Sequence, residues 1–118
     1  MSGIMEMARS LGNSLARTDE YQALRRAASA ADDDREIAEQ RSTLEKLEGT
    51  ITAALRAGQD PDEETAKAYE AAVSVLQGNS TYQRLVAAQA NFDKMVQKVN
   101  ETIAQGLDEG ASSRIILT

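Results

Sequence analysis

Apolar residues in this chain recur every three to four positions, which is the spacing of amphipathic helices, and strand-like alternation is missing before the C-terminal tail. The pattern predicts an all-α fold, an elongated helical bundle of about five helices. The expected helices cover residues 3–17, 19–31, 34–57, 61–78 and 80–106.

Polar residues and glycines at the ends of these segments indicate where the helices begin and end. Thr18 is a suitable N-cap for the second helix, and Asp33, with Glu36 three residues later, for the third. Gly58 stands where a left-handed residue closes a helix. The pair Asp60-Pro61 predicts a fourth helix with proline in its first position.

The last helix is expected to be the longest, from Asn79 to Gly106. Asn79 and Ser80 offer capping side chains, and Gln83 lies three residues after Ser80, the spacing of a capping box. Gly106 is expected to end the helix. The rest, residues 108–118, is predicted to be a flexible tail after a single domain over residues 1–107.

The third and fifth helices each carry an apolar seam with a period near 3.5 residues, so we expect them to pair antiparallel. Alanine is abundant and aromatic residues are only 3% of the chain, so the core of a monomer should be thin. We therefore predict a homodimer or a higher homo-oligomer that pools its seams. The seam residues are Leu44, Leu47, Ile51, Leu85, Phe92, Met95, Val99 and Ile103.

The tail ends in the aliphatic run Ile115, Ile116 and Leu117. Two interpretations stay open for it. It is either a disordered end or a short strand that docks on a partner by adding to a sheet.

Composition removes most enzyme classes. The chain has no His and no Cys, so the commonest general base, thiol nucleophiles and thiolate metal sites are absent. No cofactor is expected. The net charge of −6 argues against direct nucleic-acid binding. No apolar run is long enough for a membrane span, and we expect a cytoplasmic protein.

Two alternatives rest on carboxylates and on length. Glu36 with Glu39, and Glu45 with Glu48, each place two carboxylates on one helix face, as in Mg-dependent all-α nucleotide pyrophosphohydrolases of the MazG type. The second motif of those enzymes, Glu-x-x-Asp, is missing. A secreted helical hairpin of the WXG type is similar in length, but it needs a Trp that this chain lacks.

The order of several motifs resembles the YlbF/YmcA family of small bacterial helical proteins over residues 3–107. These motifs are the segment Asp19–Leu24, the Asp-rich turn before the third helix, the connection Arg56–Asp60, and the last helix with Tyr82 and Leu85 followed by Phe92. Each is a low-specificity pattern of capping and core residues, and their spacing carries the resemblance.

The resemblance implies an all-α bundle that self-associates and has no enzymatic activity. Some family members act with partner proteins as regulators of an endoribonuclease that processes mRNA, and they use cysteines for an iron–sulfur cluster. Because this chain has no Cys, the cluster cannot be carried over, and the chain looks more like the YheA-type subgroup. The expected function is a helical adaptor or regulator with an unidentified protein partner.

Overall fold

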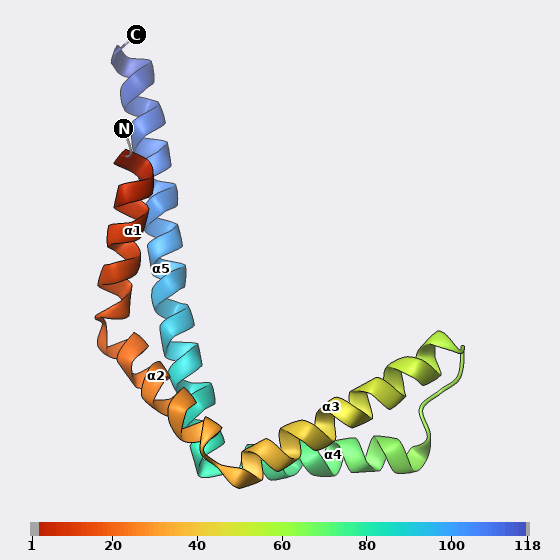
Figure 1. Cartoon of the computed structure of the whole chain (residues 1–118). Helices are drawn as coiled ribbons and strands as arrows, with labels where there is room; N and C mark the ends of the chain where they lie inside the picture. The colour runs from red at the N-terminus through yellow and green to blue at the C-terminus, as the bar shows by residue number, and fades with distance from the viewer. Residues whose placement is uncertain (1–2, 118) are drawn as a thin grey trace. The chain divides into compact units, whose positions relative to one another are not determined.

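The computed structural model describes the backbone of residues 3–117 and the side chains of residues 3–112. Within that backbone the chain is all-α and forms no strand, which confirms the predicted fold class (Figure 1). The helices are α1 (Gly3–Ala16), α2 (Asp19–Asp32), α3 (Arg35–Arg56), α4 (Glu63–Gly78) and α5 (Ser80–Leu117).

The chain divides into two compact units. Unit 1 contains the residues up to Leu24 and those from Ala88 onward, so it holds α1, the start of α2 and most of α5. Unit 2 is Arg25–Ala87, with the rest of α2, all of α3 and α4, and the beginning of α5. The single domain expected over residues 1–107 stays a prediction.

In unit 2, helices α3 and α4 pack along each other (Figure 1). We expected α3 to pair with α5, but its neighbour within this unit is α4, and the α3–α5 pairing is not verified. The apolar core of the unit joins Ala31, Ile37 and Leu76, and Ile37 is fully buried. Three partly buried residues pack against this cluster: Leu44, Tyr82 and Leu85.

The first turn of α3 differs from the prediction by one residue. Asp34, rather than Asp33, is the N-cap, because its Oδ1 accepts a hydrogen bond of 3.0 Å from the Ile37 amide. Asp34 has extended backbone angles, as an N-cap requires. This cap fixes where α3 begins, directly before the buried Ile37 side chain.

The end of α3 is the predicted left-handed glycine. Gly58 has a φ of 74°. Its amide donates to the Leu55 carbonyl at 3.0 Å, and the Gln59 amide donates to the Ala54 carbonyl at 2.9 Å. These two bonds form a Schellman motif, which satisfies carbonyls that the helix itself leaves free.

Helix α4 begins later than the sequence predicted. Asp62 is its N-cap and accepts a hydrogen bond of 3.4 Å from the Glu64 amide. Helical structure therefore starts at Glu63, and Pro61 precedes the helix instead of occupying its first position. The expected end of α4 at Gly78 is confirmed.

The corners between α1 and α2 and between α4 and α5 have the same pattern of hydrogen bonds. In each, a capping side chain accepts from the amide of a tyrosine three residues later: Tyr21 donates to Thr18 Oγ1 at 3.2 Å, and Tyr82 donates to Asn79 Oδ1 at 2.9 Å. The cap at Thr18 confirms the prediction. At the second corner the cap is Asn79, so Ser80 does not serve as one.

A glutamine after each tyrosine ties the corner to the preceding helix. Gln22 Nε2 donates to the Ala16 carbonyl, and Gln83 Nε2 donates to the Gln77 carbonyl, both at 2.7 Å. The capping-box role expected for Gln83 is therefore wrong, because its amide bonds to the previous helix. Each corner satisfies a carbonyl at a helix end, where intrahelical donors are missing.

Helix α5 does not end at Gly106, contrary to the prediction. It continues through Gly106 and Gly110 to Leu117, a length of 38 residues. Glycine in a helix interior costs only about 1 kcal/mol relative to alanine, so a glycine without a left-handed conformation does not stop a helix. Among the described glycines, only Gly58 has a positive φ.

Candidate interaction surfaces

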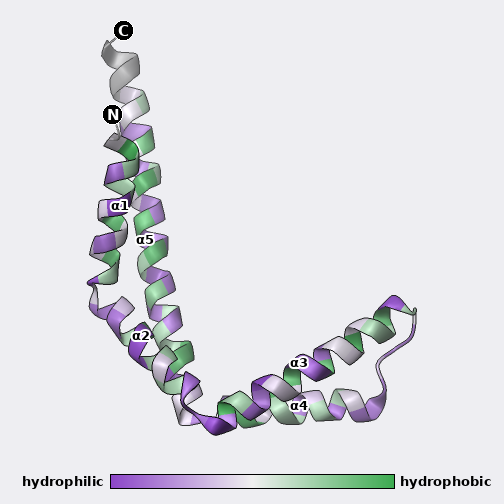
Figure 2. Ribbon diagram, viewed as in Figure 1, coloured by the Kyte–Doolittle hydropathy of each residue, from purple (hydrophilic) through white to green (hydrophobic). Residues whose placement is uncertain are grey.

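Unit 1 presents an apolar face without a core beneath it. No residue of α1 is buried, although its apolar side chains follow a helical stripe. Ile4, Met5 and Met7 are 78%, 73% and 71% exposed. On α5, Ile103 and Leu107 are also largely exposed. Figure 2 shows the hydrophobic residues, in green, along both helices.

An open groove of about 290 Å³ lies between α1 and α5. Its walls come from one residue of α1 and several turns of α5. The lining residues are Leu11, Met95, Lys98, Val99, Thr102 and Ile103. The walls are almost wholly apolar, and Lys98 is the single lining residue with a charged side chain, so the groove suits an apolar helix better than a polar small molecule.

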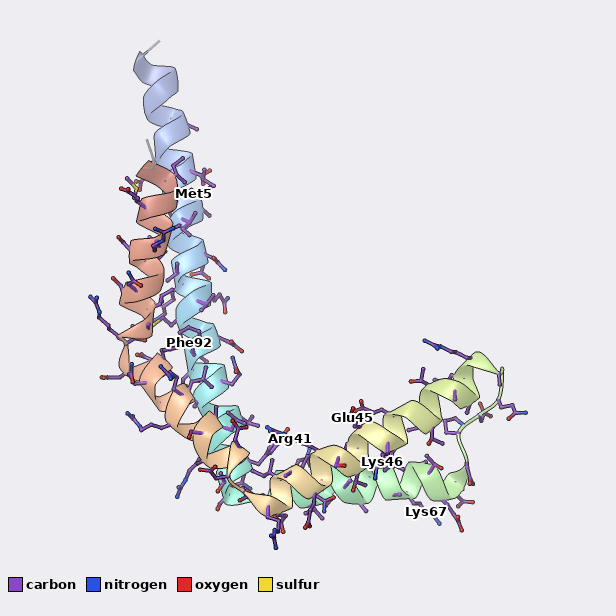
Figure 3. All side chains as sticks on the ribbon, viewed as in Figure 1. Met5, Arg41, Glu45, Lys46, Lys67 and Phe92 are labelled. Carbon is purple, nitrogen blue, oxygen red and sulfur yellow. The ribbon has the colours of Figure 1, made fainter. Side chains whose placement is uncertain are left out.

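Four residues of the predicted seam belong to this unit. Phe92, Met95 and Val99 are half-buried on α5, and Ile103 is exposed. Phe92 packs on Tyr21 of α2, with ring centroids 5.2 Å apart. Figure 3 labels Phe92. The other three line the groove, so this part of the seam stays accessible.

The other four seam residues belong to unit 2, where they contribute to the packing of that unit. Leu44 and Leu85 pack against the core cluster of that unit. Leu47 and Ile51 are half-buried along α3. The predicted seam is thus divided between two units, and its unit 2 part stabilises the unit itself.

Sequence reasoning missed the contribution of α1. The stripe of Ile4, Met7 and Leu11 was visible in the sequence, but it predicted only a helix and not a surface. Lys98 and Thr102 were also missed, because polar residues give no apolar signal. The available clue was that α1 carries a strong apolar stripe, whereas α2, which follows it, has only Tyr21 and Leu24 as large apolar residues.

The tail residues Ile115, Ile116 and Leu117 lie outside the described side chains. The backbone there is helical and continuous with α5. Their proposed docking on a partner stays a prediction.

The carboxylates proposed for Mg²⁺ are part of the surface of unit 2. Glu36 accepts a hydrogen bond of 2.8 Å from Asn79 Nδ2, so it links the start of α3 to the start of α5. Glu39, Glu45 and Glu48 are exposed, and Figure 3 shows Glu45 on α3. Within the described residues, no three acidic side chains gather in a geometry that could hold a metal ion.

Ion pairs are few in the described part of the chain. Arg41 and Asp32 approach to 3.9 Å, and Lys67 and Glu63 to 3.3 Å within α4. Both pairs are largely exposed, so each stabilises the fold by about 1 kcal/mol or less. None of the helices described here combines the length and the apolar composition that crossing a membrane requires.

The fold and this surface define the class: a small all-α protein whose most distinctive described feature is an uncovered apolar face. The family model described as "Control of competence regulator ComK, YlbF/YmcA" matches residues 4–108. The chain therefore belongs to the YlbF/YmcA family, as its motifs had indicated, and this family is linked to a regulatory role. A search of curated proteins finds no match to the chain.

Proposed function

We propose that this protein is a non-enzymatic helical regulator that acts through protein–protein contacts made by the apolar face of unit 1. Two observations support the proposal. The description of the family names control of a competence regulator, which is a regulatory role. The exposed side chains of α1 and α5 offer a binding surface. Exposed apolar patches of this kind mark interaction sites.

The regulated process that we propose is RNA processing or a related cytoplasmic activity, since some family members regulate an endoribonuclease. The protein would act there through a protein partner rather than by contacting RNA. The net charge of −6 supports contact with a protein rather than with RNA, because binding of RNA phosphates requires clustered cations.

We also propose that the protein self-associates as a homodimer or a higher homo-oligomer. Among the residues of unit 1 whose side chains are described, Ala88 alone is buried. Two helices with so little shared core stabilise each other weakly, because hydrophobic stabilisation grows with the apolar area removed from water. A further copy or a partner must supply that area.

Complementation tests this function in the organism that encodes the protein. The gene is deleted, and transcript ends are compared after return of the wild type, Ile4→Lys, Leu107→Lys or Leu55→Lys. Leu55 is a matched control, since it is 60% exposed but lies on α3 in unit 2. Wild type and Leu55→Lys should restore the transcript pattern, while the two unit 1 variants should not.

Two results would contradict the proposal. One is restoration of transcript ends by all variants, or no change on deletion, which would remove the regulatory role. The other is steady hydrolysis of nucleoside triphosphates by the purified protein with Mg²⁺, abolished by Glu39→Gln. That result would favour the pyrophosphohydrolase reading.

A further inference from the structure

The groove between α1 and α5 requires an occupant that satisfies its own backbone hydrogen bonds. All of its lining residues lie inside these two helices, with Leu11 on α1 and the others on α5. The amides and carbonyls inside a helix are already bonded along the helix, so the walls offer no free strand edge. An extended peptide therefore finds no backbone partner there, whereas a helix needs none.

The groove also has the length of a short helical ridge. Met95 and Ile103 stand at its two ends on α5, about 12 Å apart along the helix axis. An apolar ridge formed by positions i, i+4 and i+7 of a helix covers about 10 Å. Such a ridge would remove from water the apolar walls, including Ile103, which is 50% exposed.

Lys98 gives one side of the groove a positive rim. Because the lining surface is almost wholly apolar, Lys98 contributes its methylene stem to the wall and carries its ammonium at the edge. Lys94 lies one helical turn earlier on the same side of α5. Both lysines are exposed, and among the described residues neither forms a salt bridge.

The neighbouring acidic residues of α5 do not neutralise this rim. Asp93 Oδ1 accepts a hydrogen bond of 2.9 Å from Gln89, and Glu101 Oε1 accepts one of 3.5 Å from Gln97. Neither acid lines the groove, and both lie further around α5 from it than Lys98 does. The positive rim is therefore complementary to an acidic side chain supplied from outside the chain.

We propose that this groove binds an amphipathic helix of another protein, with Asp or Glu beside its apolar ridge on the side that meets Lys98. This assignment rests on the proposed function, contact through unit 1, and adds the chemistry of the partner. Two copies that meet groove to groove bring no acid to Lys98, because the lining residues include none. Ile4 and Leu107 are exposed outside the groove and stay available for the proposed self-association.

Two synthetic peptides of about 18 residues test the charge preference, a length at which isolated helices begin to form. They share one leucine ridge on an alanine background and differ only beside the ridge, with glutamate in one and lysine in the other. Their affinities for the full-length protein are measured by fluorescence anisotropy at low salt. The glutamate peptide should bind about five- to tenfold tighter, because Lys98 attracts its carboxylates and repels ammonium groups.

Variants of the groove separate charge from apolar contact. Lys98→Glu should reverse the preference, and Lys98→Arg should keep it. Ile103→Ser should weaken both peptides by a similar factor, because it removes apolar wall without changing the charge. Lys46→Glu on α3, an exposed residue of unit 2, is the matched control and should leave both affinities unchanged. Circular dichroism of each variant shows whether its helices are intact.

Four results would overturn the proposed partner. Three come from the peptides: binding of neither, equal affinities for both, or a preference that Lys98→Glu leaves unchanged. The fourth comes from sedimentation of the protein with the glutamate peptide. If the peptide converts oligomers into monomers, a second copy is the occupant of the groove. Peptide binding without a change of oligomeric state is the expected result.

Complementation distinguishes a wrong partner from a wrong function. Lys98→Arg should restore the transcript ends, and Lys98→Glu should not. If Ile4→Lys and Leu107→Lys fail while Lys98→Glu restores the pattern, the regulatory face stands and the acidic helix is rejected. If every variant restores the pattern, the proposed function itself fails.

Discussion

The aromatic rings of Tyr21 and Phe92 pack at a tilt, with centroids 5.2 Å apart and ring planes 57° apart. Tyr21 lies in the first turn of α2 and Phe92 on α5, so the pair joins two segments of unit 1 that are distant in sequence. Both residues are half-buried. With so few buried residues in this unit, the contact is a main source of its packing.

Replacing these rings should reveal a direct coupling. Phe92→Leu and Tyr21→Leu, singly and together, form a double-mutant cycle in chemical denaturation. We expect a coupling free energy of about 0.5–1.5 kcal/mol, the range for a tilted aromatic pair. Tyr69→Leu on α4 is the control partner for Phe92→Leu and should add independently. Additive effects of Tyr21→Leu and Phe92→Leu would show that the rings do not stabilise each other.

The core of unit 2 predicts a large difference between two leucines. Leu76 is 5% exposed and packs with Ala31 and Ile37, whereas Leu55 is 60% exposed on α3. Leu76→Ala should lower the free energy of unfolding by about 2–5 kcal/mol, because it removes buried methyl groups and leaves a cavity. Leu55→Ala should cost less than about 1 kcal/mol. Equal effects in thermal unfolding would mean that Leu76 is not part of a packed core.

Asn79 connects the starts of two helices, and the hydrogen bonds of its amide group determine whether a substitution there raises or lowers the stability of the protein. Its Oδ1 caps α5, and its Nδ2 donates to Glu36 at 2.8 Å. Asn79→Asp keeps a capping acceptor but places a carboxylate against Glu36 and near Asp34, so we expect destabilisation of about 1–2 kcal/mol.

Glu36→Gln provides the rescue for that variant, because glutamine can donate to the new carboxylate. The double variant Asn79→Asp with Glu36→Gln should recover most of the lost stability in urea unfolding. If Asn79→Asp is as stable as the wild type, the contact between residues 79 and 36 contributes nothing to folding.

Two glycines of the same region should respond in opposite directions to alanine. Neither Gly49 nor Gly58 has an atom within 4 Å of where a Cβ would stand, so space does not decide the outcome. Gly58 has a φ of 74°, and Gly58→Ala should cost about 1–2 kcal/mol. Gly49 lies inside α3, and Gly49→Ala should stabilise the protein by about 0.5–1 kcal/mol. Melting temperatures that move in the same direction would contradict the left-handed cap.

The sequence by itself determined the number and type of the helices and several of their ends. Thr18 and Gly58 were predicted correctly because capping depends on residues only a few positions apart. Local signals were less certain where two candidates stood together. Asp34 replaced Asp33, and Asp62 replaced Asp60, since the turn geometry decides which carboxylate reaches a free amide.

Only the tertiary structure decided which apolar stripe meets which. Leu44 and Phe92 looked equivalent in the sequence, yet one packs on the core of unit 2 and the other on Tyr21 in unit 1. Likewise, the exposure of Ile4 and Met7 cannot be deduced from their helical spacing. The physical reason is that periodicity fixes the apolar side of a helix, whereas its partner depends on where distant segments of the chain come together.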